Sequence, residues 1–209
     1  MTPAAQQALA NLRQTDQMQW YVIPLLALVF YIYLNEIEKR NWSAVWLGIG
    51  TWAGEMIWEM FNGAILHFTQ FAPLWSTPGP TAFEIYAGLN LEITLFFSLA
   101  GLLLVKVLPR DPTLKILGLP NRILIPIGGG LLALFVEIIL NQCGLLVWDW
   151  WFWRWPHVYL IAIAYCAPAL GLAWLHDHSS LRAKRRGAFI LLALALACHL
   201  ILATMLGWV

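Results

Sequence analysis

Charged side chains are scarce in this chain. Lys, Arg, Asp and Glu make up 11% of the 209 residues and hydrophobic residues 61%, whereas a soluble domain has about 25% charged residues. This shortage excludes an ordinary soluble domain and predicts a polytopic membrane protein. The net charge of +1 gives no reason to expect a nucleic-acid partner.

Cysteine is also scarce. The three cysteines, Cys143, Cys166 and Cys198, all lie in apolar segments without CxxC spacing, which excludes a disulfide framework and a cysteine metal site. The histidines show no Glu-x-x-His or His-x-x-x-His spacing, so we expect no metal site. The chemistry that we consider below also needs no cofactor.

Long hydrophobic runs fill most of the chain. A membrane-crossing helix needs about 20 apolar residues. Six stretches approach or exceed this length: residues 19–37, 43–68, 82–107, 122–147, 157–175 and 187–208. We therefore predict an all-α polytopic bundle of about six transmembrane helices forming one domain over residues 19–209. Residues 1–18 are expected to form a short interfacial helix or to be disordered.

Basic residues indicate the orientation. Positive charge is concentrated in short cytoplasmic loops of membrane proteins. Ten of the twelve Lys and Arg residues fall in alternate loops of the six-helix arrangement, namely Lys39, Arg40, Lys106, Arg110, Lys115, Arg122, Arg182, Lys184, Arg185 and Arg186. We expect these loops to be cytoplasmic, both termini to face outward, and the membrane to be a bacterial inner (plasma) membrane.

Four glutamates interrupt the apolar stretches. They are Glu55 and Glu59 in the second stretch, Glu92 in the third and Glu137 in the fourth. Each ionisable group at membrane depth costs about 2.5 kcal/mol or more, so we take these four as the candidate site. Interhelical hydrogen bonding is the structural alternative for any one of them.

Helical spacing groups these residues on shared faces. Glu55 and Glu59 lie one turn apart with Asn62 one turn further, and Glu137 stacks on Asn141. Two carboxylates in low dielectric without a nearby cation cannot both ionise cheaply. At least one is therefore expected to hold a proton at neutral pH and to be able to donate it.

The second and fourth stretches resemble each other. Each has a mid-depth glutamate (Glu59, Glu137), an asparagine about one turn further out, and then a loop rich in Trp and Pro. One interpretation is a parallel repeat of predicted helices 2–3 and 4–5, with a site at the interface between the copies. Chance similarity between two apolar hairpins is the other interpretation.

Two segments resemble a known class of membrane enzyme. The segment Asn90-Leu91-Glu92-Ile93-Thr94-Leu95-Phe96-Phe97 looks like the acidic motif of small integral-membrane lycopene cyclases, in which Pro-x-Glu-Glu is followed by paired Phe. Residues 55–62, which include Trp58-Glu59, are similar to the Trp-Glu element of fungal membrane meroterpenoid cyclases. The Pro and the second Glu of the first motif are missing, which leaves the identity of the acid open.

The resemblance implies that a carboxylic acid protonates an isoprenoid alkene or epoxide and that the ring closes through a carbocation. Glu59 or Glu92 would be the acid, and Glu137 its partner or the final base, with Glu55 beside them. The expected substrate-binding residues are Trp52, Trp58, Asn62, Asn90, Asn141 and Phe96. The partners would be a hydrophobic isoprenoid or lipid substrate and the surrounding membrane lipids.

Two other functions fit the same residues. Protonatable groups at mid-depth, kinked helices and a repeat are also typical of proton- or cation-coupled transporters of small solutes. A non-catalytic subunit that holds a pigment or lipid in a larger membrane complex is the third alternative. An aqueous pathway along the second and fourth helices would favour transport, whereas a closed cavity open to the bilayer would favour an enzyme.

Overall fold

The computed structural model describes residues 1–16 and 18–209, so residue 17 of the predicted N-terminal segment lies outside the described residues. The first elements are α1 (Pro3–Asn11), α2 (Val22–Glu38), α3 (Trp42–Thr69), β1 (Glu84–Tyr86), β2 (Leu89–Asn90), α4 (Leu91–Val107) and β3 (Lys115–Ile116). They are followed by β4 (Leu119–Pro120), α5 (Asn121–Gln142), the 3-10 helix η1 (Trp151–Trp153), α6 (Val158–His178), α7 (Leu181–Cys198) and the π-helix η2 (His199–Met205). The all-α class is confirmed.

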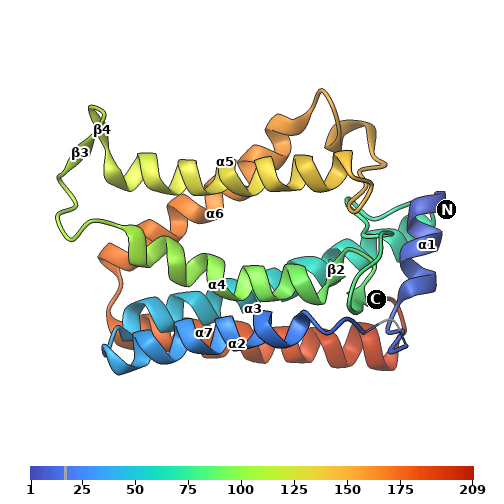
Figure 1. The fold of residues 1–209 in the computed structure, drawn as a ribbon, viewed down its shortest axis with the longest axis horizontal. Helices are drawn as coiled ribbons and strands as arrows, with labels where there is room; N and C mark the ends of the chain where they lie inside the picture. The colour runs from blue at the N-terminus through green and yellow to red at the C-terminus, as the bar shows by residue number, and fades with distance from the viewer. Residues whose placement is uncertain (17) are drawn as a thin grey trace.

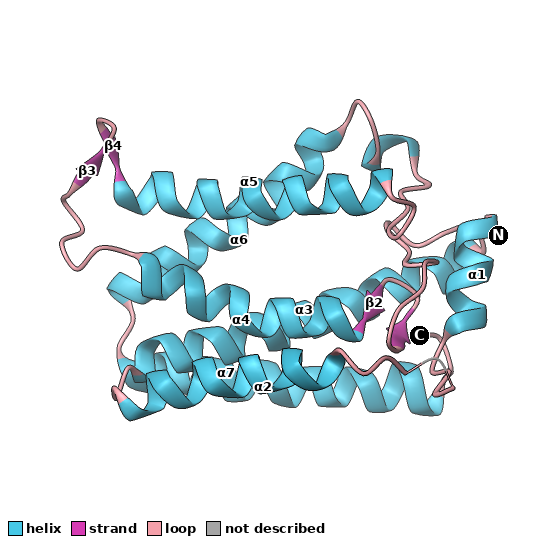
Figure 2. Cartoon of the chain, in the orientation of Figure 1, coloured by secondary structure: helices cyan, strands magenta, loops and turns pink. Residues whose placement is uncertain are grey.

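The long helices lie along one common axis, as Figures 1 and 2 show. α3 packs most extensively against α4 and α7, and α5 packs against α6. Both chain ends lie at one end of the bundle together with α1, whereas the β3–β4 hairpin extends from the opposite end (Figure 1). The loops with most of the basic residues are therefore at the end opposite the termini.

The third long helix, α4, begins later than the sequence suggested. Residues 82–107 were expected to form one helix, but Glu84–Tyr86 and Leu89–Asn90 form an antiparallel hairpin. α4 begins at Leu91 because the Asn90 side chain accepts a hydrogen bond from the Ile93 N–H (2.9 Å) as a helix N-cap. Glu92 therefore lies in the first turn of α4, near the chain termini, and not at mid-helix.

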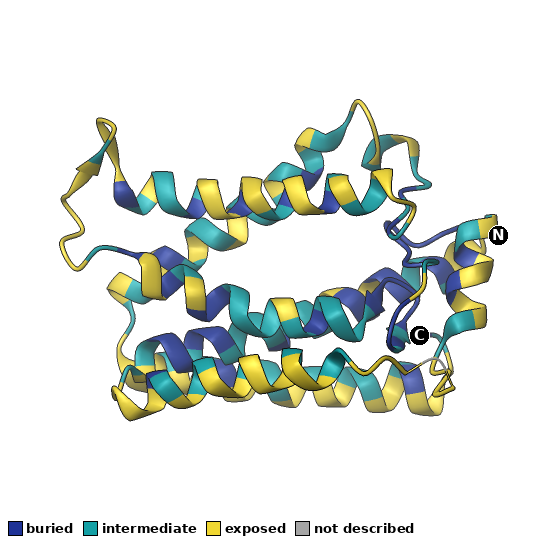
Figure 3. Ribbon diagram, in the orientation of Figure 1, coloured by how far each residue is buried: buried dark blue, intermediate teal, exposed yellow. Residues whose placement is uncertain are grey.

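Within residues 1–16 and 18–209, three helices are long and apolar enough to cross a membrane by length and composition. They are Asn121–Gln142, Val158–His178 and the continuous helix Leu181–Met205. The other long helices are not among these three: α2 and α4 have 17 residues each, and α3 carries Glu55 and Glu59. Of the six expected crossings, three are thus supported. Figure 3 shows exposed positions along the outer faces of the helices, and many are large hydrophobic residues such as Leu132, Phe135 and Ile163, as helices that face lipid would have.

A close glycine contact joins α5 to α6. A Cβ atom on Gly130 would lie 2.9 Å from the backbone N and Cα atoms of Cys166, whereas a Cβ on Gly128 would have no heavy atom within 4 Å. Small residues let membrane helices approach each other in this way. Gly130 therefore sets the distance between the two helices.

Replacing Gly130 with alanine should destabilise the protein by about 1–3 kcal/mol, because the added methyl group meets backbone atoms that cannot rotate away. Gly128→Ala is the matched control, and it should be neutral or stabilising because alanine favours the helix. Thermal unfolding of both variants in detergent would measure the difference. Equal midpoints would contradict the packing role of Gly130.

Candidate functional site

Glu59 on α3 is buried, with 1% of its surface exposed, and it is paired with a tryptophan. Trp75, in the loop after α3, donates its indole N–H to both carboxyl oxygens of Glu59 (3.0 and 3.2 Å). Asn62, one turn further along α3, accepts from the Leu74 N–H (2.7 Å) and donates to the Trp75 carbonyl (2.8 Å). The asparagine thus fixes the loop that carries the indole donor.

Glu137 on α5 has the same kind of partner. Trp148, in the loop after α5, donates its indole N–H to Glu137 Oε1 (2.8 Å). Asn141, one turn further along α5, donates to the Leu146 carbonyl (3.0 Å). In both helices, then, a glutamate is bound by an indole and an asparagine fixes the loop that follows.

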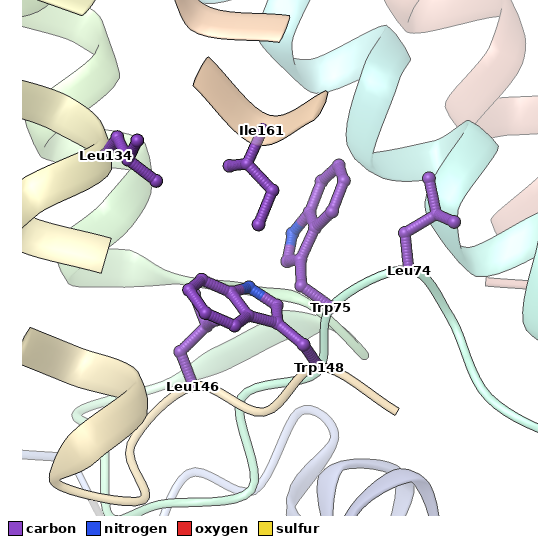
Figure 4. Close-up of a cluster of buried hydrophobic side chains, with 6 residues drawn as sticks. All are labelled: Leu74, Trp75, Leu134, Leu146, Trp148 and Ile161. Carbon is purple, nitrogen blue, oxygen red and sulfur yellow. The ribbon is translucent and has the colours of Figure 1, made fainter. Parts of the chain in front are cut away.

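The two loops are joined to each other. Ser76 and Val147 exchange two backbone hydrogen bonds, of 3.0 Å and 2.8 Å, in an isolated antiparallel bridge. The neighbouring Trp75 and Trp148 lie in one buried hydrophobic cluster, which Figure 4 shows. Its members are Leu74, Trp75, Leu134, Leu146, Trp148 and Ile161. The bridge brings together the two tryptophans that bind Glu59 and Glu137.

Further polar groups lie around these two glutamates. Glu55 on α3 is within electrostatic reach of Glu137 and of Glu59. Tyr165 on α6 is within reach of Glu137, Glu55 and Glu59. Glu137 Oε2 is buried and makes no hydrogen bond of 3.5 Å or shorter to a described residue, while the Tyr165 hydroxyl interacts with the Glu137 carboxyl group. Three carboxyl groups and a phenol from three helices therefore lie within electrostatic reach of at least one other member of the group.

Aromatic rings adjoin this acidic group. The Trp75 ring centroid is 6.2 Å from that of Trp58 and 6.1 Å from that of Trp153. Phe97 stacks on Tyr165 at 6.4 Å. Of the predicted aromatic site residues, Trp58 therefore adjoins the acidic group, because its ring packs against Trp75, which binds Glu59.

The other predicted aromatic residues lie apart from the cluster. Trp52 donates to Thr94 Oγ1 (3.1 Å) and so links α3 to α4. Phe96 is 49% exposed, and its ring lies edge-on to that of Phe97 with the two ring centroids 5.6 Å apart. Neither residue contacts Trp75 or Trp148 in a ring pair.

Glu92 has a different role from Glu59 and Glu137. Its side chain holds the start of α4 to neighbouring segments. Its Oε1 accepts from the Tyr21 hydroxyl and from the Ala82 N–H (2.9 Å), and its Oε2 accepts from Thr81 Oγ1 (2.6 Å). Asn90, which was expected to bind substrate, serves as the N-cap of the same helix. Both residues thus have a clear structural function.

Glu84 in β1 is a second buried carboxyl at this end of the bundle. It is 1% exposed and accepts a hydrogen bond from the Thr77 hydroxyl. Burial, with a smaller contribution from the charge of Glu92, raises the pKa of Glu84 from 4.5 to about 8, although the Thr77 hydrogen bond opposes this shift. The folded protein therefore favours the protonated form of Glu84.

This pKa makes stability depend on pH. Between pH 4.5 and about 8 the unfolded chain releases the Glu84 proton while the folded chain retains it, so the free energy of unfolding falls as pH rises. The contribution is complete below pH 4.5 and is lost by about pH 8. Glu84→Gln should abolish this component and stabilise the protein by about 1–3 kcal/mol at pH 8. Thermal unfolding of Glu84→Gln between pH 4.5 and about 8 tests this prediction, with Glu38→Gln at an exposed position as the control. The same dependence of unfolding temperature on pH in both variants would contradict it.

Metal binding has no ligand set to support it. Among residues 1–16 and 18–209, no group of three or more His, Cys, Asp or Glu side chains is arranged to hold a metal ion. The carboxyl, phenol and indole groups of the acidic cluster can transfer protons and form hydrogen bonds.

Two comparisons with known proteins give the family. A protein of Archaeoglobus fulgidus described as an "Uncharacterized protein" is 38% identical over 209 residues, which cover all of this chain and 99% of the relative. No solved structure matches the chain. A family model described as "Uncharacterized membrane protein family" matches residues 2–204, and the chain belongs to that family.

Proposed function

We propose that this protein is an integral-membrane enzyme that protonates an isoprenoid alkene or epoxide and guides the resulting carbocation to a cyclised or isomerised product. The single observation that carries this proposal is the state of Glu137. One of its carboxyl oxygens is held by Trp148, and the other, Oε2, is buried and makes no hydrogen bond of 3.5 Å or shorter to a described residue, with the Tyr165 hydroxyl as the neighbouring polar group that interacts with this carboxyl group. An acid held in this way is oriented by Trp148 and can donate a proton from its other oxygen.

Glu137 is therefore the proposed acid, in place of Glu59 or Glu92. Both oxygens of Glu59 face the Trp75 indole, and both oxygens of Glu92 accept hydrogen bonds at the start of α4. In the proposed step the O–H bond of Glu137 breaks and the π electron pair of the alkene forms a new C–H bond, which leaves a cation. Such general acid catalysis contributes typically about 10²–10⁴-fold to a rate.

Glu55 is the proposed final base, with Glu59 beside it. After ring closure, a carboxylate takes a proton from a carbon next to the cation, and that C–H electron pair restores an alkene. No oxidant or cofactor is needed, because the proton gained in the first step balances the proton lost in the last. The electrostatic reach between Glu55 and Glu137 supports this pairing.

Aromatic rings would stabilise the intermediate. The faces of Trp and Phe attract positive charge, with about 0.5–2 kcal/mol for each well-placed ring. Trp58, Trp75 and Trp153 form a continuous row of rings beside the glutamates. In this proposal Asn62 and Asn141 act as positioning residues, because each holds the loop that carries an indole donor.

We further propose that all six long helices lie in the membrane, with the basic loops on the cytoplasmic side of a plasma membrane and both termini outside. The shared glutamate, asparagine and tryptophan pattern of α3 and α5 supports a parallel repeat of α3–α4 and α5–α6. In that arrangement the site lies at the interface between the two copies, where membrane-protein repeats often place it.

Mass spectrometry tests the reaction. Lipid extracts of a host that supplies isoprenoid precursors are compared after expression of the wild type and of a variant with Glu55, Glu59 and Glu137 all changed to Gln. A cyclised or isomerised isoprenoid found only with the wild type is the expected result. Identical lipid profiles, with both proteins present in the membrane at equal amounts, would overturn the proposal.

Proton-coupled transport is the second candidate, and one observation favours it. Glu55, Glu59, Glu137 and Tyr165 come from three helices and act on one another electrostatically, as the members of a proton relay do. Purified protein in vesicles with a pH gradient would then dissipate that gradient when the solute is added. The enzyme proposal predicts no such flux.

A further inference from the structure

A polar pocket of about 800 Å³ is lined by residues within 36–41, 105–112 and 176–178 and by residue 122. These segments lie at the end of the bundle opposite the termini (Figure 1). The pocket lies between the ends of α2, α4, α5 and α6 and the segment that leads to the β3–β4 hairpin. The charged side chains that line it are Glu36, Lys39, Lys106, Arg110, Arg122 and Asp177. None of these residues belongs to the acidic cluster around Glu137.

Positive charge exceeds negative charge in this pocket. Glu36 pairs with Lys106 (2.9 Å) and, more distantly, with Lys39 (3.8 Å). Asp177 accepts two hydrogen bonds from the Arg122 guanidinium, of 2.7 Å and 3.0 Å. With four cations against two anions, the pocket has a net charge of +2.

Arg110 is the cation in this pocket that has no partner among the described residues. It lines the pocket, is exposed, and makes no ion pair or hydrogen bond within residues 1–16 and 18–209. Lys106 and Arg122, in contrast, are already held by carboxylates. A bound anion would therefore gain the attraction of Arg110 without breaking an internal ion pair.

Apolar surface adjoins the charged pocket. Val107 on α4 and Trp174 on α6 are each 59% exposed, one within a turn of Lys106 and the other within a turn of Asp177. Trp174 stacks on His178, which also lines the pocket, at 5.2 Å. An exposed indole beside a polar rim is typical of the level at which lipid headgroups meet the hydrocarbon.

We propose that this pocket binds the phosphate group of an anionic membrane lipid, with the acyl chains lying along the adjacent apolar faces of α4 and α6. Cationic pockets between the ends of membrane helices bind such headgroups, and each Lys or Arg near the surface contributes about 1 kcal/mol. The site is independent of the proposed reaction, since no residue of the pocket takes part in proton transfer there.

Native mass spectrometry of the purified protein tests the site with phosphatidylglycerol and with phosphatidylcholine as the two probes. The wild type should retain phosphatidylglycerol in preference. Arg110→Gln should weaken that binding about fivefold, the equivalent of one surface charge. Lys115→Gln is the control, because Lys115 is exposed on β3 outside the pocket, and it should bind as the wild type does.

Three results would overturn the proposal. Equal retention of both lipids would mean that the headgroup charge is not recognised. Equal weakening by Arg110→Gln and Lys115→Gln would assign the binding to general surface charge. Inorganic phosphate that binds the lipid-free protein as tightly as phosphatidylglycerol does would make this a site for free phosphate. If phosphate binds much more weakly than phosphatidylglycerol and displaces the lipid only at millimolar concentration, the lipid assignment is supported.

Discussion

Changing Glu137 to glutamine should lower product formation by about 10²–10⁴-fold, which is the typical contribution of a general acid. Glutamine has nearly the same shape, and its amide oxygen can still accept the Trp148 indole N–H that now reaches Glu137 Oε1. The cluster of buried side chains should therefore stay intact. What is lost is the acidic proton on the second oxygen.

The control for this variant is Glu38→Gln, the same chemical change at an exposed position at the end of α2. Turnover of the wild type and both variants would be followed by mass spectrometry of the product, together with the unfolding temperature of each protein. A Glu137→Gln protein that folds normally and turns over at the wild-type rate would remove Glu137 from the reaction. Rate loss in Glu38→Gln of the same size would show that the assay reports something other than the acid.

The buried carboxyl group of Glu84 holds its proton to a higher pH than a carboxyl group at the surface does. Glu84 is enclosed by the loop between α3 and α4, and its Oε2 has no hydrogen-bond partner among the described residues. Its proton stabilises the fold below pH 8 without a part in the proposed reaction. A pH dependence of turnover that persists in Glu84→Gln would therefore be assigned to the acidic cluster and not to unfolding.

Much of the fold could be predicted from hydrophobic run length alone, because a helix that crosses a membrane must be predominantly apolar over about 20 residues. The second stretch, predicted at 43–68, is the helix Trp42–Thr69, and the fifth, predicted at 157–175, is the helix Val158–His178. The start of α4 was missed since Tyr86, Ala87 and Leu89 are as apolar as a helix core, although they form a buried hairpin. The N-cap residue Asn90 was the available signal.

The glutamates of the site could be found from the sequence, but their partners could not. The sequence shows loops rich in Trp and Pro after Glu59 and Glu137, but it does not show that Trp75 and Trp148 are only 7% and 5% exposed and donate to these glutamates. Each tryptophan follows its glutamate through a loop, and loop geometry is not encoded in helical periodicity. Tyr165 was also missed; its signal is a single hydroxyl in the apolar centre of α6.

Replacing Asn62 with leucine should destabilise the protein by about 2–5 kcal/mol. The Asn62 side chain is fully buried, and its amide satisfies the Leu74 N–H and the Trp75 carbonyl. Leucine fills a similar volume but leaves both backbone groups unpaired in an apolar site, at about 1–3 kcal/mol for each. The loop should then release Trp75 from Glu59.

Asn141→Leu is the matched control, because this asparagine occupies the same place after Glu137 but is only partly buried and makes a single hydrogen bond, to the Leu146 carbonyl. Its cost should be about 1–2 kcal/mol, so the two unfolding temperatures in detergent should differ clearly. Tryptophan fluorescence would detect the release of Trp75 in the Asn62 variant. Equal destabilisation by the two changes would mean that Asn62 fills space without fixing the loop, and Asn62 would then lose its proposed positioning role.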